Sequence, residues 1–203
     1  MIETHTTRET WLLKATNQLQ IKVFTPENLT IPHDVKISCG FAIGSRAGSK
    51  KMTLGVCHPR SHSEDLVNEI FMSPQIDDSI QTLGTVAHEL IHAINDCQRG
   101  HVRAFRDMTH AIGLTGKMTS TTETPELVEI LKTIVDDLGE YPHAKLNLNK
   151  RPKQGTRNIK MECTDDHGNG CGFSFRTSQK NVDMIQVVTC PACCSETSYL
   201  SIA

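Results

Sequence analysis

Two histidines and a glutamate are spaced in the sequence as in sites that carry out hydrolysis at a metal ion. His88, Glu89 and His92 lie within Val86–Ala93 in the pattern His-Glu-x-x-His. On an α-helix, residues four apart share one face, so the two imidazoles project side by side and can bind one zinc ion. Glu89 is then placed to activate a water molecule. The same pattern also occurs by chance in helices that carry surface histidines.

The residues around this pattern favour a helix with a buried face of its own. Asp77, Asp78 and Ser79 supply hydrogen-bond acceptors and negative charge where such a helix begins. Apolar residues recur at steps of three and four, which is typical of a stripe packed against a core. These residues are Ile80, Leu83, Ala87, Leu90 and Ile94.

A catalytic zinc site normally has three protein ligands and one position left for water. We expect His101 to be the third ligand, because Gly100 before it permits a sharp turn that brings a second helix back toward the pair. His110 and Glu123 are alternatives, since a carboxylate from a later helix completes some zinc peptidase sites. In the mechanism that follows, zinc polarises a scissile carbonyl, and Glu89 transfers a proton from water to the leaving amine.

Four cysteines near the end of the chain form a second candidate metal site. They are Cys163, Cys171, Cys190 and Cys193. Four thiolates around one tetrahedral zinc make a closed structural site, and a unit this small rarely folds without such a staple. The second pair has Cys-x-x-Cys spacing, whereas seven residues separate the first pair.

An enlarged loop must therefore bring Cys171 back to the metal. His167 could replace Cys163 as a ligand, and Cys194 could compete with Cys193. The remaining cysteines have no partner at a metal-binding spacing, so we interpret each as a small buried apolar residue. They are Cys39, Cys57 and Cys97.

The elements that position these residues predict an α+β fold with a small three-stranded sheet packed against helices. Thr6 and Glu9 make a capping box, and Thr124 followed by Pro125 is a strong helix start. Predicted helices span residues 6–20, 79–96, 102–112 and 125–138, and predicted strands span 35–39, 52–57 and 69–72. The third strand is either an ordinary core strand or a free edge that an extended peptide can join.

Length and composition suit one medium domain followed by a small module. The 203 residues contain no apolar run that approaches the roughly 20 residues needed to span a bilayer. We expect no membrane partner, and the absence of a signal-peptide pattern predicts a cytoplasmic protein with reduced cysteines. The expected parts are a domain at 1–140 that carries the histidines, a basic linker at 141–158 and a cysteine module at 159–203.

The charge distribution differs between these parts. Residues 1–140 have a net charge of −5, and residues 141–203 have a net charge of +3. Basic residues in and after the linker suit contacts with nucleic-acid phosphates, and a solvated linker is the alternative. These residues are Lys150, Arg151, Lys153, Arg157 and Lys160.

The sequence also resembles a known family. The segment His88–Ala93, followed by Gly100, His101 and Phe105, is similar to the SprT-like metallopeptidases, the group that includes Spartan-type proteases. The short bacterial and bacteriophage members are the most similar in pattern. Further matching segments are Ser38–Phe41, Glu69–Pro74, Gly113–Thr119, Tyr141–Ala144 and Lys153–Arg157.

The resemblance implies a zincin-like domain with catalytic Glu89, three histidine ligands and a C-terminal zinc ribbon, in a bacterial cell or a phage-infected host. It departs from the family at Cys163 and Cys171, where similar members carry a tight Cys-x-x-Cys. Spartan-type relatives cleave proteins attached to DNA, but a shared fold and site do not transfer a substrate.

The leading hypothesis is therefore a zinc-dependent endopeptidase that acts on protein or peptide substrates, DNA-associated proteins among them. The alternative is a non-catalytic, zinc-stabilised protein that binds nucleic acid or has a regulatory role. Glu89 argues against this alternative, because a purely structural site needs no base between its histidines.

Overall fold

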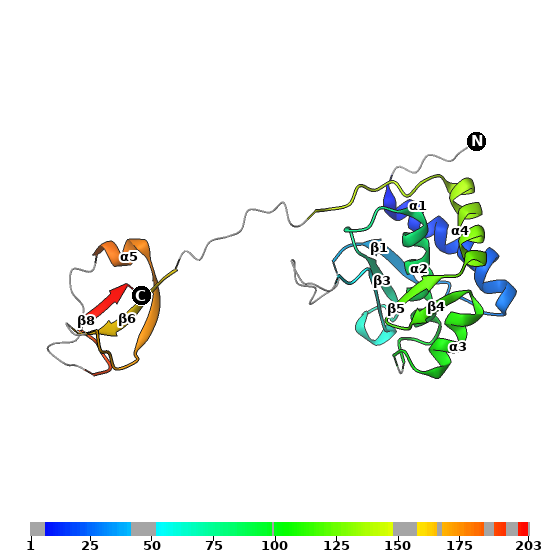
Figure 1. Cartoon of the computed structure of the whole chain (residues 1–203). Coiled ribbons are helices and arrows are strands. Elements are labelled where there is room, and N and C mark those ends of the chain that lie inside the picture. The colour runs from blue at the N-terminus through cyan, green and yellow to red at the C-terminus, as the bar shows by residue number, and fades with distance from the viewer. Residues whose placement is uncertain are drawn as a thin grey trace. The chain divides into compact units, whose positions relative to one another are not determined.

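The computed structural model describes residues 7–41, 52–98, 100–147, 158–165, 168–184, 189–193 and 199–202. Across these residues the fold is α+β, as the sequence predicts (Figure 1). Contacts within the chain divide it into two compact units, unit 1 at Met1–Lys150 and unit 2 at Arg151–Ala203.

Unit 1 contains a three-stranded sheet in the order β1 (Lys36–Cys39), β3 (Glu69–Met72), β2 (Gly55–His58). β3 runs parallel to β1 and antiparallel to β2. Ile70 and Met72 of β3 are buried and alternate with less buried neighbours, as a strand with one face on a core requires. The sequence predicts all three strands. Of its two alternatives for β3, the core strand is confirmed and the free edge is wrong, because β3 is central.

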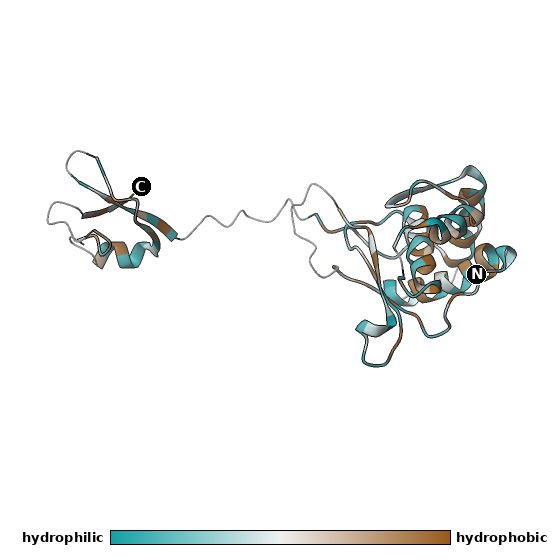
Figure 2. Cartoon of the chain, turned by 90° about the horizontal axis from the view of Figure 1, so that it is seen from below, coloured by the Kyte–Doolittle hydropathy of each residue, from teal (hydrophilic) through white to brown (hydrophobic). Residues whose placement is uncertain are grey.

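Four helices complete the core of unit 1: α1 (Arg8–Leu19), α2 (Ser79–Ile94), α3 (Arg103–Ala111) and α4 (Pro125–Leu138). α2 is the central element, because it contacts the other three helices as well as β2 and β3. Its predicted apolar stripe is packed into this core, and hydrophobic residues are concentrated in the helices of this unit (Figure 2).

The helices begin where side chains can accept hydrogen bonds from the first turn. Asp78 caps α2 and Thr124 caps α4, each through an acceptor to a backbone N–H three residues later. Pro125 occupies the first position of α4, as predicted. The N-cap of α1 is Thr7 rather than the predicted Thr6, because Thr7 is the residue whose Oγ1 accepts the N–H bond.

Three short turns of helix lie outside this core set. The chain continues from α1 through a π-helical turn, η1 (Gln20–Phe24), and a 3-10 turn, η2 (Thr25–Glu27). Another 3-10 turn, η3 (Arg60–His62), follows β2.

A hairpin that the sequence does not predict lies between α3 and α4. Its strands are β4 (Leu114–Lys117) and β5 (Ser120–Glu123), paired antiparallel. Leu114 is its one fully buried residue, so the hairpin lacks the apolar alternation that marks a strand in a sequence. β5 contacts α2, which brings the hairpin to the helix that carries His88 and His92.

Residues 141–147 pack on unit 1, although the sequence assigns them to the linker. The backbone N–H of Tyr141 donates to Ser79 Oγ at 2.9 Å, and the ring of Tyr141 lies 5.0 Å from that of Trp11. The N–H of Leu146 donates to the carbonyl oxygen of Pro74 at 2.7 Å. These contacts hold the chain against the start of α2. Residues 148–157 lie outside the described residues.

Unit 2 is a three-stranded antiparallel sheet in the order β7 (Ser174–Ser178), β6 (Asn158–Thr164), β8 (Tyr199–Ile202). A short helix, α5 (Gln179–Met184), follows β7. The hydrophobic core is small, since it contains only four buried apolar residues among those described. They are Met161, Cys163, Cys190 and Leu200.

Replacing Thr124 tests how much the N-terminal cap of α4 contributes to the stability of unit 1. Thr124→Ala should lower the free energy of unfolding of unit 1 by about 1 kcal/mol, because the N–H of Leu127 loses its acceptor. Urea unfolding followed by circular dichroism measures the change. Thr124→Ser is the matched control and should retain most of the stability. An equal loss in both variants would show that the methyl group, not the cap, is responsible.

Candidate metal centres

Three histidines converge at the end of α2. His88 and His92 lie one helical turn apart on α2, and His101 comes from the connection that precedes α3. One ring nitrogen from each can be chosen so that all three lie within 4.8 Å of one another. The Nε2 atoms of His92 and His101 are 3.3 Å apart. The structure thus brings together the three histidines that the sequence singles out, in a group that could hold a metal ion.

The two alternative ligands lie outside this group. Glu123 of β5 packs instead on α2 one turn before His88, where a Cβ atom on Gly84 would lie 1.7 Å from its carboxylate oxygen. Gly84 therefore leaves room for the Glu123 side chain beside the helix. His110 is exposed near the end of α3.

The connection from α2 to α3 reverses the chain within a few residues. Asp96 and Cys97 both have positive φ angles, 53° and 56°, which non-glycine residues seldom adopt. The Asp96 carboxylate accepts hydrogen bonds from the backbone N–H of Arg60 and from the side chain of Asn68, at 2.8 and 2.9 Å. These bonds fix the turn, and the turn delivers His101.

The ring of Phe105 on α3 contacts all three imidazoles and fixes their orientation. Its ring is fully buried and stacks on His92, with ring centroids 4.3 Å apart. The rings of His88 and His101 lie 5.1 and 4.9 Å from it. One aromatic ring in contact with all three imidazoles limits the rotamers that each can adopt.

A hydroxyl group from the unpredicted hairpin orients His88. Thr121 Oγ1 of β5 lies 3.1 Å from His88 Nδ1. A hydrogen bond at Nδ1 leaves Nε2 as the free nitrogen, and such partners commonly set the tautomer of a metal-binding histidine. Sequence reasoning missed Thr121, because its position beside α2 depends on a hairpin with no apolar pattern.

Burial favours the neutral form of the three imidazoles. It lowers the pKa of His88 to about 4, with a smaller contribution from His101. Burial lowers the pKa of His92 to about 3, assisted by the other two histidines, and it also lowers the pKa of His101. Neutral rings have a free lone pair at pH 7, which binding of a metal requires.

Glu89 lies beside this group and is pressed against the edge strand β2. Its side chain is 6% exposed, and burial raises its pKa to about 8 against a hydrogen bond from the backbone of Cys57. A Cβ atom on Gly55 would lie 2.8 Å from Glu89 Cγ, so glycine at this position lets β2 approach the carboxylate. A cation bound nearby would favour the ionised form.

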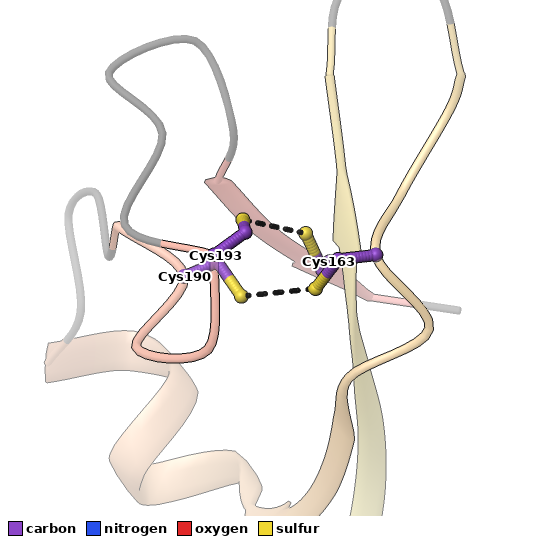
Figure 3. Close-up of side chains that lie close together, drawn as sticks. Cys163, Cys190 and Cys193 are labelled. Atoms are coloured by element: carbon purple, nitrogen blue, oxygen red, sulfur yellow. Dashed lines mark hydrogen bonds between the residues drawn. The ribbon is translucent and has the colours of Figure 1, made fainter.

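Four cysteine sulfurs form the second cluster, in unit 2 (Figure 3). Cys163 Sγ lies 3.9 Å from Cys193 Sγ, and Cys171 Sγ lies 3.6 Å from Cys190 Sγ. All four sulfurs lie within 4.8 Å of one another, so this group could also hold a metal ion. Burial raises the pKa of Cys190, but hydrogen bonds from the backbone of Cys193 and Ala192 help to lower it to about 6.

Hydrogen bonds join the described residues of the enlarged loop between the first two cysteines. The carbonyl and carboxylate oxygens of Asp165 accept hydrogen bonds from the N–H groups of Gly168 and Asn169. A Cβ atom on Gly170 would lie 1.8 Å from the carbonyl oxygen of Cys163, so only glycine can pass there before Cys171. The alternative ligands His167 and Cys194 lie outside the described residues.

The structure describes one of the five basic residues singled out for nucleic-acid contact. Lys160 lies on β6, forms an ion pair with Glu162 and stands opposite Arg176 of β7 in the register of the sheet. The other four lie outside the described residues: Lys150, Arg151, Lys153 and Arg157.

Two clusters predict two bound metal ions per chain, held independently. His88→Ala should remove one ion and leave the other, and Cys190→Ser should do the reverse, since the clusters belong to different units. Elemental analysis of the purified proteins measures the ratio. Retention of both ions in His88→Ala would exclude the histidine cluster as a site.

None of the described helices is both long and apolar enough to cross a bilayer. No protein-family model, curated protein or solved structure matches this chain.

Proposed function

We propose that the chain is a zinc-dependent endopeptidase of the SprT-like type. The observation that carries the proposal is the convergence of three neutral imidazoles beside the buried carboxylate of Glu89. In this proposal unit 1 is a zincin-like peptidase domain and unit 2 is a zinc ribbon. The α+β fold and the His-Glu-x-x-His spacing of His88, Glu89 and His92 agree with it.

The spacing of the donor atoms supports zinc at both clusters. Tetrahedral zinc with Zn–N distances of about 2.0–2.1 Å separates its nitrogen ligands by about 3.3 Å. The Nε2 atoms of His92 and His101 are 3.3 Å apart. Zn–S distances of about 2.3 Å separate sulfur ligands by about 3.8 Å. The measured distances of 3.9 and 3.6 Å in the cysteine cluster agree with this value.

The two donor sets suit different roles. Three nitrogen ligands leave one coordination position for water or substrate, whereas four sulfur ligands close the coordination sphere. His101 is exposed, so solvent reaches the histidine cluster. We therefore assign catalysis to the histidine cluster and a structural role to the cysteine cluster, which staples a unit with a small core.

The chemistry of the chain's own residues centres on Glu89. When bound, zinc supplies Lewis acidity, which lowers the pKa of water and polarises a carbonyl. The Glu89 carboxylate accepts the proton of the attacking water and passes it to the leaving amine. Its burial against β2 leaves it few rotamers, and the hydrogen bond from the Cys57 backbone holds it in place.

The edge of β2 supports a peptide as the substrate. β2 is an outer strand of the sheet and lies next to Glu89. The backbone of Cys57 bonds to Glu89 and to Cys97, so in this proposal the peptide joins the part of the edge that precedes Cys57. An extended peptide joins this part by main-chain hydrogen bonds and presents a carbonyl to the histidine cluster.

Glu89→Gln separates catalysis from metal binding. The variant should keep two zinc ions per chain but lose hydrolysis of casein by about 100-fold or more, because the amide cannot accept the proton of water. Gel assays and zinc analysis on the same preparations measure both properties. Peptidase activity equal to wild type in this variant would contradict the assignment of Glu89.

Single-stranded DNA belongs in the same assay, because the substrates proposed include DNA-associated proteins. Faster cleavage with DNA would support a role for the basic residues. A wild-type protein that binds DNA and zinc but cleaves no protein would instead favour the non-catalytic alternative.

Thr121→Val tests the hydrogen bond to His88. Valine keeps the shape of threonine but removes the hydroxyl, so the affinity of the histidine cluster for zinc should fall by about 10- to 100-fold. Competition with a chelator measures the affinity. Thr122→Val, on the exposed side of the same strand, is the matched control and should leave it unchanged. Equal losses in both variants would attribute the effect to the strand rather than to the hydroxyl.

A further inference from the structure

Cys57 and Cys97 meet in the structure, although nothing in the sequence predicts it. They are 40 positions apart, and their Sγ atoms lie 3.4 Å from each other. Cys97 Sγ also lies 3.4 Å from the carbonyl oxygen of Cys57. Both are free, half-buried thiols. Cys57 packs against the apolar core, as expected of a small apolar residue, but its contact with Cys97 is not predicted.

This thiol pair is separate from the two metal clusters. Neither cysteine belongs to the histidine group or to the four-cysteine group of unit 2. Cys39, the other free cysteine described in unit 1, interacts with Tyr141. Two thiols in contact, with no third ligand grouped with them among the described residues, are suited to becoming a disulfide rather than to binding a metal.

We propose that Cys57 and Cys97 form a reversible disulfide on exposure to hydrogen peroxide. One sulfur attacks the peroxide oxygen, the O–O bond breaks, and a sulfenic acid and one water form. The second sulfur attacks the sulfenic sulfur and displaces its oxygen as a second water. The two sulfurs lose two electrons, hydrogen peroxide gains them, and both thiol protons end in water.

The positions of the two residues allow the bond to close. A disulfide has an S–S distance of about 2.0 Å, so the sulfurs must approach by about 1.4 Å. Cys57 lies on an edge strand, and Cys97 lies in the turn after α2, next to the exposed residue Gln98. Neither is inside a helix, so a shift of this size does not require a helix to break.

The disulfide links two segments that hold the proposed active site. The backbone of Cys57 bonds to Glu89, and the backbone N–H of Cys97 donates to the carbonyl oxygen of His92 at 2.7 Å. Drawing these segments together changes the spacing between the base and the histidines. This consequence, unlike the disulfide itself, rests on the proposed peptidase function. Since a displacement of about 1 Å can lower a rate about 100-fold, we expect turnover to fall by about tenfold or more.

Peptide mapping tests the disulfide without reference to activity. Reduced, zinc-loaded full-length protein is treated with hydrogen peroxide, its free thiols are alkylated, and the digest is analysed by mass spectrometry. We expect one linked peptide pair that contains Cys57 and Cys97 and that dithiothreitol separates. Cys57→Ser and Cys97→Ser should each abolish it, whereas Cys39→Ser should retain it. Separate alkylation of both cysteines after peroxide treatment would overturn the proposal.

Casein cleavage by the same samples tests the consequence. Oxidised wild type should be slower than reduced wild type and recover with dithiothreitol, and Cys97→Ser should keep its turnover in peroxide. Linked peptides with unchanged turnover would overturn the regulatory effect. If reduced wild type cleaves nothing, the peptidase proposal fails, and peptide mapping still decides whether the disulfide forms.

Discussion

Close approach of neighbouring elements to α2 is the constraint on which unit 1 depends. α2 buries its apolar stripe in the core and also carries His88, Glu89 and His92. Gly55 lets the edge strand touch Glu89, and Gly84 makes room for a carboxylate of the hairpin. A methyl group at Gly55 would separate β2 from the helix, and Glu89 would lose both its burial and its backbone hydrogen bond.

The parts of the structure that rest on local pattern could be read from the sequence. The strands of the first sheet, the start of α4 at Thr124 and the metal-binding spacings are local, and the structure contains them. The hairpin β4–β5 could not be predicted, because its strands are polar and gain their place from α2. Thr121 was missed with it. The pairing of Cys57 with Cys97 was also missed, since it depends on a turn with two unusual φ angles.

The two candidate metal clusters obtain ligands in a metal-binding protonation state in different ways. In unit 1, burial and mutual repulsion keep the imidazoles neutral, so each offers a lone pair, and a core of many apolar residues already holds them in place. In unit 2 the core is small, and backbone hydrogen bonds favour the thiolate form of Cys190. In unit 1 the ligand group is organised by the core without a metal, whereas in unit 2 a bound metal would supply much of the organisation.

Cys57 connects the edge strand β2 both to Glu89 of α2 and to the turn that follows α2. Its backbone bonds to the Glu89 carboxylate, its carbonyl oxygen accepts from Cys97, and its sulfur lies against the sulfur of Cys97. The Cys97 N–H in turn bonds to the residue that ends the His-Glu-x-x-His pattern. A change at either sulfur therefore reaches Glu89 and His92 through one or two hydrogen bonds. Because packed elements shift as units, a movement too small to unfold the protein is large enough to change the distance between the Glu89 carboxylate and the three histidines.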